Sequence, residues 1–360
     1  MKLYIKELRE AKGLTQKELA ELMQVSFQTI SKWENGVNFP DITHIPRMAD
    51  IFGVSADIIL GLEPLHKEEI KRYDEVDYWN DNREIIKVWK ELYWNDDYFN
   101  FFVRDVLRFS KPIDMIDFGC GYGYLGMKFM PLLAEGSSYT GIELDQGQIK
   151  EAEEIFSQRQ LKYEFINENI YDFQPEKKYD LVVAMLLLSY MPHPEELLLK
   201  MKECLKPGGT ILLIDVNMEV EQAGFYSGLE KAENGLTRPD FIPLWEYEAL
   251  NGERDYRMGT KLPYMLKKVG FQNIGARISD QVTIYEPADH DKKKINDIFR
   301  FVYSHEDSYQ GGLNYFLNHG CSLQRAKEFM DYYNRTSEYF DNKESIAIKT
   351  SGMYFVYATI

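Results

Sequence analysis

The sequence predicts two domains of different class: a small all-α domain, then a larger α/β domain with a doubly wound parallel sheet and a C-terminal helical insertion. A chain of 360 residues is long enough for about two domains. Residues 1–64 contain short amphipathic segments separated by helix breakers, whereas residues 113–215 alternate strand-like and helix-like segments. The charged stretch at residues 65–77 has no strong apolar period, so we expect it to be a linker.

Composition excludes several classes of protein. Hydrophobic residues make up 44% of the chain and charged residues 28%, which is enough apolar material for packed cores and excludes a wholly disordered chain. The longest apolar stretch, residues 181–191, is about half of what a bilayer requires. Glu7 and Glu10 lie where a signal peptide needs an apolar core. We therefore expect a cytoplasmic protein without a membrane partner.

The cysteines and the net charge exclude further classes of protein and of site. Cys120, Cys204 and Cys321 are far apart and follow no metal-ligand spacing, so we expect neither a disulfide framework nor a metal site. The chain has 42 basic and 58 acidic residues, a net charge of −16, which repels phosphate backbones over most of the surface. Any contact with nucleic acid must therefore be local.

The N-terminal domain shows the pattern of a helix, a tight turn and a second helix. Thr15 and Glu18 have the spacing of a capping box, which predicts the start of one helix. Ser26 can cap the next helix, whose inward face would contain Ile30 and Trp33. Polar side chains are left on the outward face of that helix.

This stretch, residues 3–62, resembles the Cro/repressor-type (xenobiotic-response-element) helix-turn-helix domain through TQKELA, ISKWENG and FGVSADIILG. The resemblance implies that the third helix lies in the DNA major groove and that Gln16 contacts the backbone. The residues that it implies near the bases are Gln28, Thr29, Ser31 and Lys32. A DNA operator is then the expected partner of residues 1–64, and a homodimer is expected because such domains usually engage two half-sites.

The same helices could instead form only a dimerisation or protein-docking module. Residues 1–64 contain seven basic and nine acidic residues, which is a poor balance for DNA. The polar outward face of the third helix favours DNA binding, because nothing else explains that group of side chains.

The α/β domain is expected over residues 78–360. Its five strand-like segments are IDMIDFG, SYTGIEL, YEFINENI, YDLVVAML and GTILLIDV, and the turn of Lys206 to Gly209 should introduce the fifth. Right-handed crossovers bring the carboxyl ends of parallel strands to one edge of the sheet, where ligands bind. The nine aromatic residues within residues 78–102 are expected mainly to pack.

A glycine-rich loop follows the first strand. Glycines in it allow a ligand to approach the backbone. The loop also fits G-x-G-x-x-G through Gly121, Gly123 and Gly126, which is the dinucleotide fingerprint. Asp117 is expected to face the loop as a fixed negative charge, which would repel a diphosphate and attract an ammonium or a sulfonium. Glu143 closes the second strand, where a carboxylate can accept both hydroxyls of a ribose.

Together, IDFGCGYG, YTGIEL, NENIYDF, KYDLVVAM and LKPGGTILLID resemble the five motifs of class I S-adenosylmethionine-dependent methyltransferases, a Rossmann-like fold. The resemblance implies S-adenosyl-L-methionine as cofactor, with Glu143 on the ribose and Leu144 against the purine. The residues that it implies at the methionine end are Asp117, Gly119, Cys120, Gly121 and Gly123. Those that it implies at the adenine edge and beneath it are Asn169, Ile170, Met185 and Leu186. Asn169 stands where many relatives carry Asp, and its amide can both donate and accept.

Few catalytic groups are required, because a sulfonium methyl is already activated and the enzyme has mainly to align an acceptor with it. Tyr190 and His193 are the nearest polar residues after the fourth strand, and Tyr190 could orient or deprotonate a substrate. The alternative is that Tyr190 packs in the core and His193 lies on a surface turn. The sequence therefore indicates no firm catalytic base.

The acceptor is expected to be a small molecule. DNA methyltransferases resemble one another in an Asp/Asn-Pro-Pro-Tyr/Phe or a Pro-Cys motif after the fourth strand, where this chain reads AMLLLSYMP. One alternative is a transcriptional regulator that senses S-adenosylmethionine without turnover, and another is a nicotinamide-dependent oxidoreductase. The helical insertion, at about residues 289–342, precedes the last strand, and it could be a substrate lid or structural padding.

Overall fold

The computed structural model describes residues 3–11, 14–52, 54, 56–62, 94–159, 161–228, 240–250, 254–286, 312, 316, 319, 321–342 and 344–360. Two compact units divide the chain: Met1–Arg83 with Glu246–Arg254, and Glu84–Trp245 with Asp255–Ile360. The predicted linker, and residues 289–311 of the predicted insertion, lie outside the described residues. No described helix is long and apolar enough to cross a membrane.

The N-terminal unit is helical, as expected. Its helices are α1 (Ile5–Ala11), α2 (Gln16–Met23), α3 (Phe27–Glu34), η1 (Ile42–His44), α4 (Ile45–Phe52) and α5 (Ala56–Ile59). The capping box of Thr15 and Glu18 is present, and the Ser26 side chain accepts a hydrogen bond from the Thr29 N–H. Ile30 and Trp33 are buried in the core of this unit, which confirms the inward face of α3.

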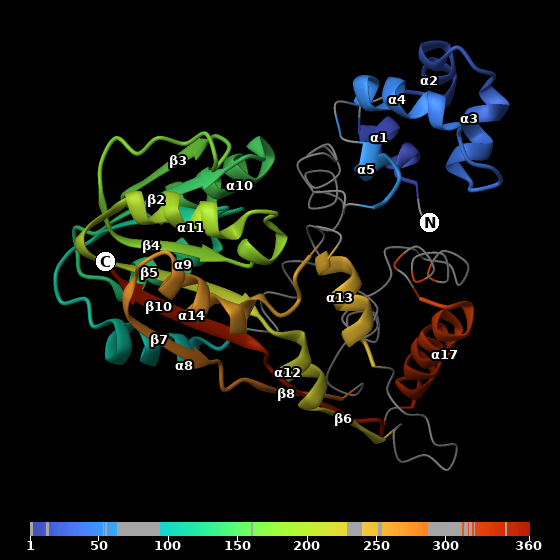
Figure 1. Cartoon of the computed structure of the whole chain (residues 1–360). Helices are drawn as coiled ribbons and strands as arrows, with labels where there is room; N and C mark the ends of the chain where they lie inside the picture. Colours follow the sequence, from blue (N-terminus) through green and yellow to red (C-terminus); the bar gives the residue numbers. More distant parts are fainter. Residues whose placement is uncertain are drawn as a thin grey trace. The chain divides into compact units, whose positions relative to one another are not determined.

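A seven-stranded sheet of order β3-β2-β1-β4-β5-β10-β7 forms the centre of the second unit (Figure 1). Its strands are β1 (Asp114–Phe118), β2 (Ser138–Glu143), β3 (Tyr163–Asn167), β4 (Tyr179–Met185), β5 (Leu205–Val216), β7 (Gln272–Ile278) and β10 (Met353–Thr359). The first five in chain order pair in parallel, whereas β10 runs antiparallel to both β5 and β7. The five predicted parallel strands are therefore confirmed.

Helices cover both faces of this sheet. The helices on one face are α8 (Asp96–Phe101), the π-helix η2 (Phe102–Leu107), α9 (Tyr124–Phe129), η3 (Met130–Leu132) and α10 (Gln146–Ser157). Those on the other face are α11 (Pro194–Glu203) and α14 (Met258–Lys268). Alternation along β1 sends Met115 to the first face and Ile116 to the second, as expected for a strand buried on both sides.

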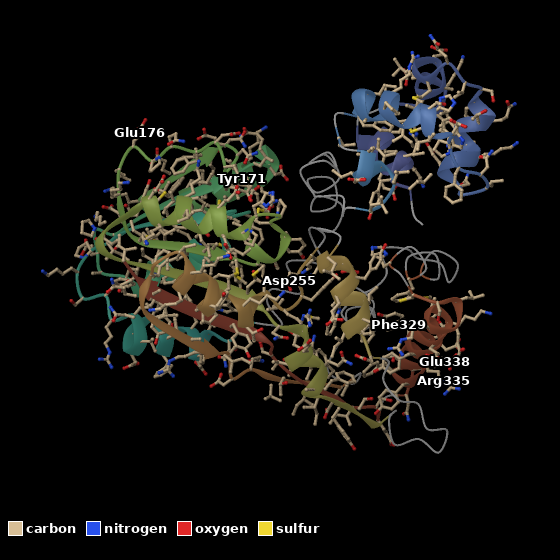
Figure 2. The ribbon with its side chains drawn as sticks, in the orientation of Figure 1. Tyr171, Glu176, Asp255, Phe329, Arg335 and Glu338 are labelled. Carbon is tan, nitrogen blue, oxygen red and sulfur yellow. The ribbon has the colours of Figure 1, made fainter. Side chains whose placement is uncertain are left out.

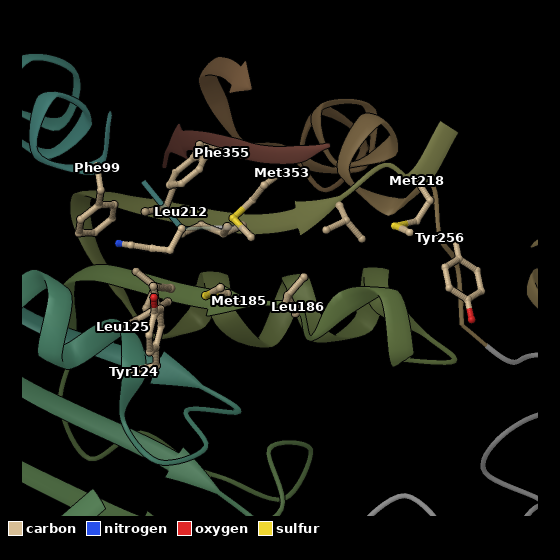
Figure 3. Packing of buried hydrophobic residues seen from close by; sticks show 14 of the residues in the cluster. Phe99, Tyr124, Leu125, Met185, Leu186, Leu212, Met218, Tyr256, Met353 and Phe355 are labelled. Carbon is tan, nitrogen blue, oxygen red and sulfur yellow. The ribbon is translucent and has the colours of Figure 1, made fainter. Parts of the chain in front are cut away.

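The described part of the aromatic segment packs in the core. Trp94, Phe99 and Phe102 are buried against Phe355 of β10, with ring centroids 5.1–6.4 Å apart. Figure 3 shows Phe99 and Phe355 in this cluster. The packing interpretation is thus confirmed for Trp94, Tyr98, Phe99 and Phe102, whereas Phe101 is 42% exposed.

The C-terminal segment forms two strands where the sequence analysis expected a single last strand. It divides into β9 (Ala347–Thr350) and β10, and β9 joins β6 (Phe225–Ser227) and β8 (Val282–Tyr285) in a separate sheet of order β6-β9-β8 (Figure 1). The division falls at Gly352, where a Cβ atom would be 2.2 Å from the Asn217 carbonyl oxygen. Only glycine allows that close approach.

The remaining helices of the second unit are short, apart from α17. They are η4 (Leu188–Tyr190), α12 (Met218–Ala223), α13 (Ile242–Leu250, whose C-terminal part belongs to the first unit) and α17 (Leu323–Tyr339). Helix α17 lies in the predicted insertion, so the described part of that segment is helical. An ion pair joins Lys349 of β9 to Glu221 of α12, with Nζ and Oε2 2.8 Å apart and the two side chains 9% and 1% exposed.

The start of β5 also differs from the expectation. The strand begins at Leu205, before the expected turn, and its register with β4 shifts between the pairs Tyr179–Leu205 and Leu181–Thr210. Gly208, with a φ of +76°, lies in this irregular stretch. The turn is therefore an interruption inside the strand rather than its start.

Candidate functional site

The glycine-rich loop joins β1 to α9 at the carboxyl edge of the sheet. Gly119, Gly121 and Gly123 all have positive φ, at +66°, +56° and +81°. A Cβ atom on Gly123 would be 2.7 Å from the Phe156 ring, so this turn requires glycine for both conformation and space. Cys120 is buried and donates its N–H to the Ile142 carbonyl over 3.0 Å. Its side chain therefore belongs to the core.

Glu143, the last residue of β2, connects that strand to the glycine-rich loop. Its Oε2 accepts the Gly121 N–H at 2.9 Å. Its Oε1 accepts the N–H groups of Leu144 at 2.8 Å and Asp145 at 3.0 Å. In the described part of the chain it makes these backbone hydrogen bonds and no ion pair. Leu144 beside it is an exposed large apolar side chain at 46%.

Asp117 does not face the loop from solvent. Its side chain is 2% exposed, and Oδ2 accepts a hydrogen bond from the Tyr139 hydroxyl over 2.9 Å. Burial raises the pKa of Tyr139 well above its usual value, and the Asp117 carboxylate raises it further. The structure thus places this carboxylate on the face of the sheet covered by α8, α9 and α10, because Asp117 alternates with Phe118 and shares its face with Met115. Its role in ligand binding stays a prediction.

The predicted adenine-edge residues, Asn169 and Ile170, follow the end of β3. Oδ1 of Asn169 accepts the N–H of Tyr171, labelled in Figure 2, over 3.0 Å. This hydrogen bond identifies the oxygen of the amide and leaves its NH₂ group as a donor. Ile170 is half-buried and packs against the core.

Met185 is the last residue of β4 and Leu186 follows it; both are buried, at 8% and 9% exposed, in the core cluster shown in Figure 3. Leu186 has a φ of +53°, a conformation that is uncommon outside glycine. Its N–H donates to the Ile214 carbonyl over 2.8 Å. The end of β5 therefore fixes the position where the chain leaves β4.

The following turn is held in the same way. The Ser189 N–H donates to Oδ2 of Asp215 over 3.1 Å, and the Ser189 carbonyl accepts the N–H of Asp255, labelled in Figure 2, over 2.8 Å. Tyr190 is the last residue of η4 and His193 is the N-cap residue of α11, and both are half-buried. Both residues follow the end of β4 along the chain. A catalytic role for either of them stays a prediction.

Two residues that anchor this edge were missed by the sequence analysis. Asn167 donates both amide hydrogens to backbone carbonyls at the end of β2, and Asp215 accepts the Ser189 N–H from the end of β5. The available signal was a polar residue at the carboxyl end of a predicted strand. The same signal identified Glu143.

The predicted DNA-contact residues lie on α3 and at the start of α2. Gln28 and Lys32 are exposed, whereas Thr29 and Ser31 are half-buried. The Thr29 hydroxyl is 2.8 Å from that of Ser26.

Gln16 donates to Oε2 of Glu34 over 2.7 Å, and Arg9 binds the same buried carboxylate, with Nε and Oε1 2.6 Å apart. The bond to Glu34 uses one of the two hydrogens of the Gln16 amide, and a contact of this side chain with phosphate stays a prediction.

Comparisons with known proteins agree with this division of the chain. Residues 116–211 match the model of a methyltransferase domain family, and residues 5–59 match that of a helix-turn-helix family. The chain therefore carries a helix-turn-helix domain followed by a methyltransferase domain with a Rossmann-like α/β sheet.

Curated relatives are distant. A ubiquinone biosynthesis O-methyltransferase of Rickettsia akari is 24% identical over 110 residues, which cover 31% of this chain and 43% of that protein. The protein of the same name from Rickettsia felis is 20% identical over 242 residues, covering 66% and 91%. Among solved structures, a putative methyltransferase from Bacillus halodurans has a TM-score of 0.42 at 12% identity, covering 73% of this chain and 97% of its own.

Proposed function

We propose that this protein transfers a methyl group from S-adenosyl-L-methionine to a small-molecule acceptor. The proposal includes a helix-turn-helix module that binds an operator or dimerises, a homodimeric state and a cytoplasmic location. The observation that carries it is the Glu143 carboxylate, which lies at the end of β2 and accepts the N–H of Gly121 in the glycine-rich loop. That arrangement supports a nucleoside ligand, because a carboxylate at this position can accept ribose hydroxyls.

The residues present fit the adenosyl group of this cofactor. Glu143 offers carboxylate oxygens for the ribose, and the exposed Leu144 offers an apolar surface for a flat ring. Asn169 offers amide N–H donors for a ring nitrogen. When bound, the cofactor supplies an activated methyl group. The chain then has to hold the acceptor in line and exclude water.

The Glu143 carboxylate keeps its negative charge at this end of the sheet. Glu143 is bound only by backbone N–H groups in the described residues, so its charge is not neutralised by a cation there. A carboxylate at this strand end suits the ribose of either cofactor, since dinucleotide-binding folds carry one there as well. The argument against the nicotinamide-dependent alternative is the match of residues 116–211 to a methyltransferase domain, although the loop fits the dinucleotide fingerprint.

Calorimetric titration of the full chain tests the cofactor. We expect S-adenosylhomocysteine to bind with one site per chain and to raise the melting temperature, and nicotinamide dinucleotide to do neither. A thermal shift with the dinucleotide and none with S-adenosylhomocysteine would overturn the assignment.

A second experiment tests turnover. The name of the Rickettsia relatives supports beginning with phenols and catechols as acceptors, followed by metabolite extracts, all with methyl-labelled cofactor. Labelled product supports the enzyme. Cofactor binding without methyl transfer to any of them would instead support the regulator that senses S-adenosylmethionine.

DNA binding is tested by selecting sequences from a random duplex library with the full chain. We expect enrichment of a site with two half-sites, and loss of that binding in Gln28→Ala, whose exposed amide suits adenine. The comparison is Lys17→Ala on the exposed side of α2, which removes a charge outside α3 and should leave the selected sequence unchanged. No enrichment by a folded protein would favour the docking or dimerisation role.

A further inference from the structure

We propose that Asn167 is a positioning residue of the adenosyl site, because it fixes the backbone that presents Leu144 and Glu143 to the ligand. This inference rests on the proposed function. Asn167 is the last residue of β3 and pairs in register with Glu143, the last residue of β2. Its Nδ2 donates to the Glu143 carbonyl over 3.0 Å and to the Leu144 carbonyl over 2.8 Å.

The second of these hydrogen bonds reaches beyond the sheet. Strand β2 ends at Glu143, so the Leu144 carbonyl lies past the last pair of the ladder. The Glu143 carbonyl also accepts the Glu168 N–H over 3.2 Å, which continues the ladder by one bond. The side chain of Asn167 thus takes the place that a further strand residue would occupy.

Both backbone polar groups of Leu144, its N–H and its carbonyl, are therefore hydrogen-bonded. Its N–H donates to Glu143 Oε1 and its carbonyl accepts from Asn167, while Asp145, the next residue, caps α10 by accepting the Gly147 N–H over 2.7 Å. An apolar side chain that is 46% exposed on a backbone fixed from both sides is a prepared surface for a flat, apolar ring. A purine is such a ring.

The two carbonyl acceptors at this position require the side-chain amide of Asn rather than a carboxylate. Two adjacent carbonyl oxygens require two donors from one group, and the NH₂ of Asn supplies them. Aspartate has the same shape but no donor at neutral pH, so it would repel both carbonyls and add charge beside Glu143.

The test measures binding of S-adenosylhomocysteine and of adenosine to the full chain by calorimetry. We expect Asn167→Ala to weaken both ligands by the same factor, about tenfold, and Asn167→Asp to weaken them more. The control is Asn273→Asp, which makes the same charge change at β7, the opposite edge strand of the sheet, and should leave both affinities unchanged. Melting temperature and binding stoichiometry check that each variant is folded.

A double variant separates positioning from general stability. If Asn167 acts through Leu144, then Asn167→Ala combined with Leu144→Ala should bind S-adenosylhomocysteine about as well as the weaker single variant. Losses that multiply would overturn the proposal, and so would a fall in stoichiometry with unchanged affinity. Wild-type binding with unaltered affinity in both Asn167 variants would overturn only this inference. Absence of binding by the wild-type chain would overturn the proposed function as well.

Discussion

Carboxylates at the two ends of the parallel strands have different kinds of bonding partner. At the amino ends, Asp114 of β1 and Asp180 of β4 share the ammonium of Lys206, with Nζ–Oδ2 distances of 3.1 and 2.8 Å. At the carboxyl ends, Glu143 is held by backbone N–H groups from its own turn and from the glycine-rich loop. Two carboxylates at one end thus share one cation, and the other end has a carboxylate fixed in position without a cation among the described residues.

The difference shows which end is built for a ligand. A carboxylate paired with lysine has little attraction left for an incoming cation, whereas one that is bound only by amide dipoles keeps its negative potential. Backbone donors also fix its geometry without occupying all of its lone pairs. The same sheet therefore has a structural end and a binding end, and variants at matched positions can test that distinction.

Removal of the binding carboxylate should have the largest effect on ligand affinity. We expect Glu143→Ala to weaken S-adenosylhomocysteine by about 100-fold, because charge-assisted hydrogen bonding to the ribose is lost together with the acceptor that holds the Gly121 N–H. Asp180→Ala, at the other end, should leave that affinity unchanged even if it lowers stability. Equal affinities in wild type and Glu143→Ala would show that the two ends do not differ in ligand binding.

Glycine replacement gives the second comparison. Gly123 and Gly208 have similar φ angles, +81° and +76°, but a Cβ on Gly123 would meet the Phe156 ring whereas one on Gly208 meets nothing within 4 Å. Gly208→Ala should therefore cost about 1 kcal/mol of unfolding free energy from backbone strain alone. Gly123→Ala should cost about 3 kcal/mol because steric overlap is added. Urea unfolding followed by tryptophan fluorescence measures both, and similar costs would contradict the role of packing at the loop.

Topology explains what the sequence could predict here. Parallel strands joined by helices must bring their carboxyl ends together, so the strand ending in Glu143 and the loop containing Gly121 were expected at one edge and are found there. Local capping was equally predictable, because Thr15 and Glu18 need only their own turn.

Contacts between residues that are far apart in the sequence were not predictable. Asn167 is exposed on the edge strand, and only the register of β3 against β2 brings its amide to the Leu144 carbonyl. Asp117 was assigned to the loop from its position near the strand end, although its alternation with Phe118 already indicated the face that it shares with Met115. The division between β9 and β10 depends on the close approach of Asn217 to Gly352, which no local pattern contains.

The smallest expected effect is a pH-dependent change in stability caused by Asp114, at the amino end of β1. The hydrogen bond from Ser138, followed by the ammonium of Lys206, lowers the pKa of Asp114. Because the folded pKa is lower than the unfolded one of about 3.9, the ionised carboxylate stabilises the fold above that pH, and the contribution is lost as pH falls through the folded value. The group is partly exposed, so we expect only about 0.5 kcal/mol.

Asp114→Asn should then be less stable than wild type by that amount at pH 6, and the difference should shrink below pH 4, as thermal unfolding across pH 3–7 can measure. Ligand affinity should stay the same throughout, since this carboxylate lies at the end of β1 opposite the glycine-rich loop. A stability difference that is constant with pH would show that Asp114 acts by packing and not by charge. A parallel loss of S-adenosylhomocysteine binding at pH 6 would mean that the two ends of the sheet are coupled, because a local ion pair has no other route to the site.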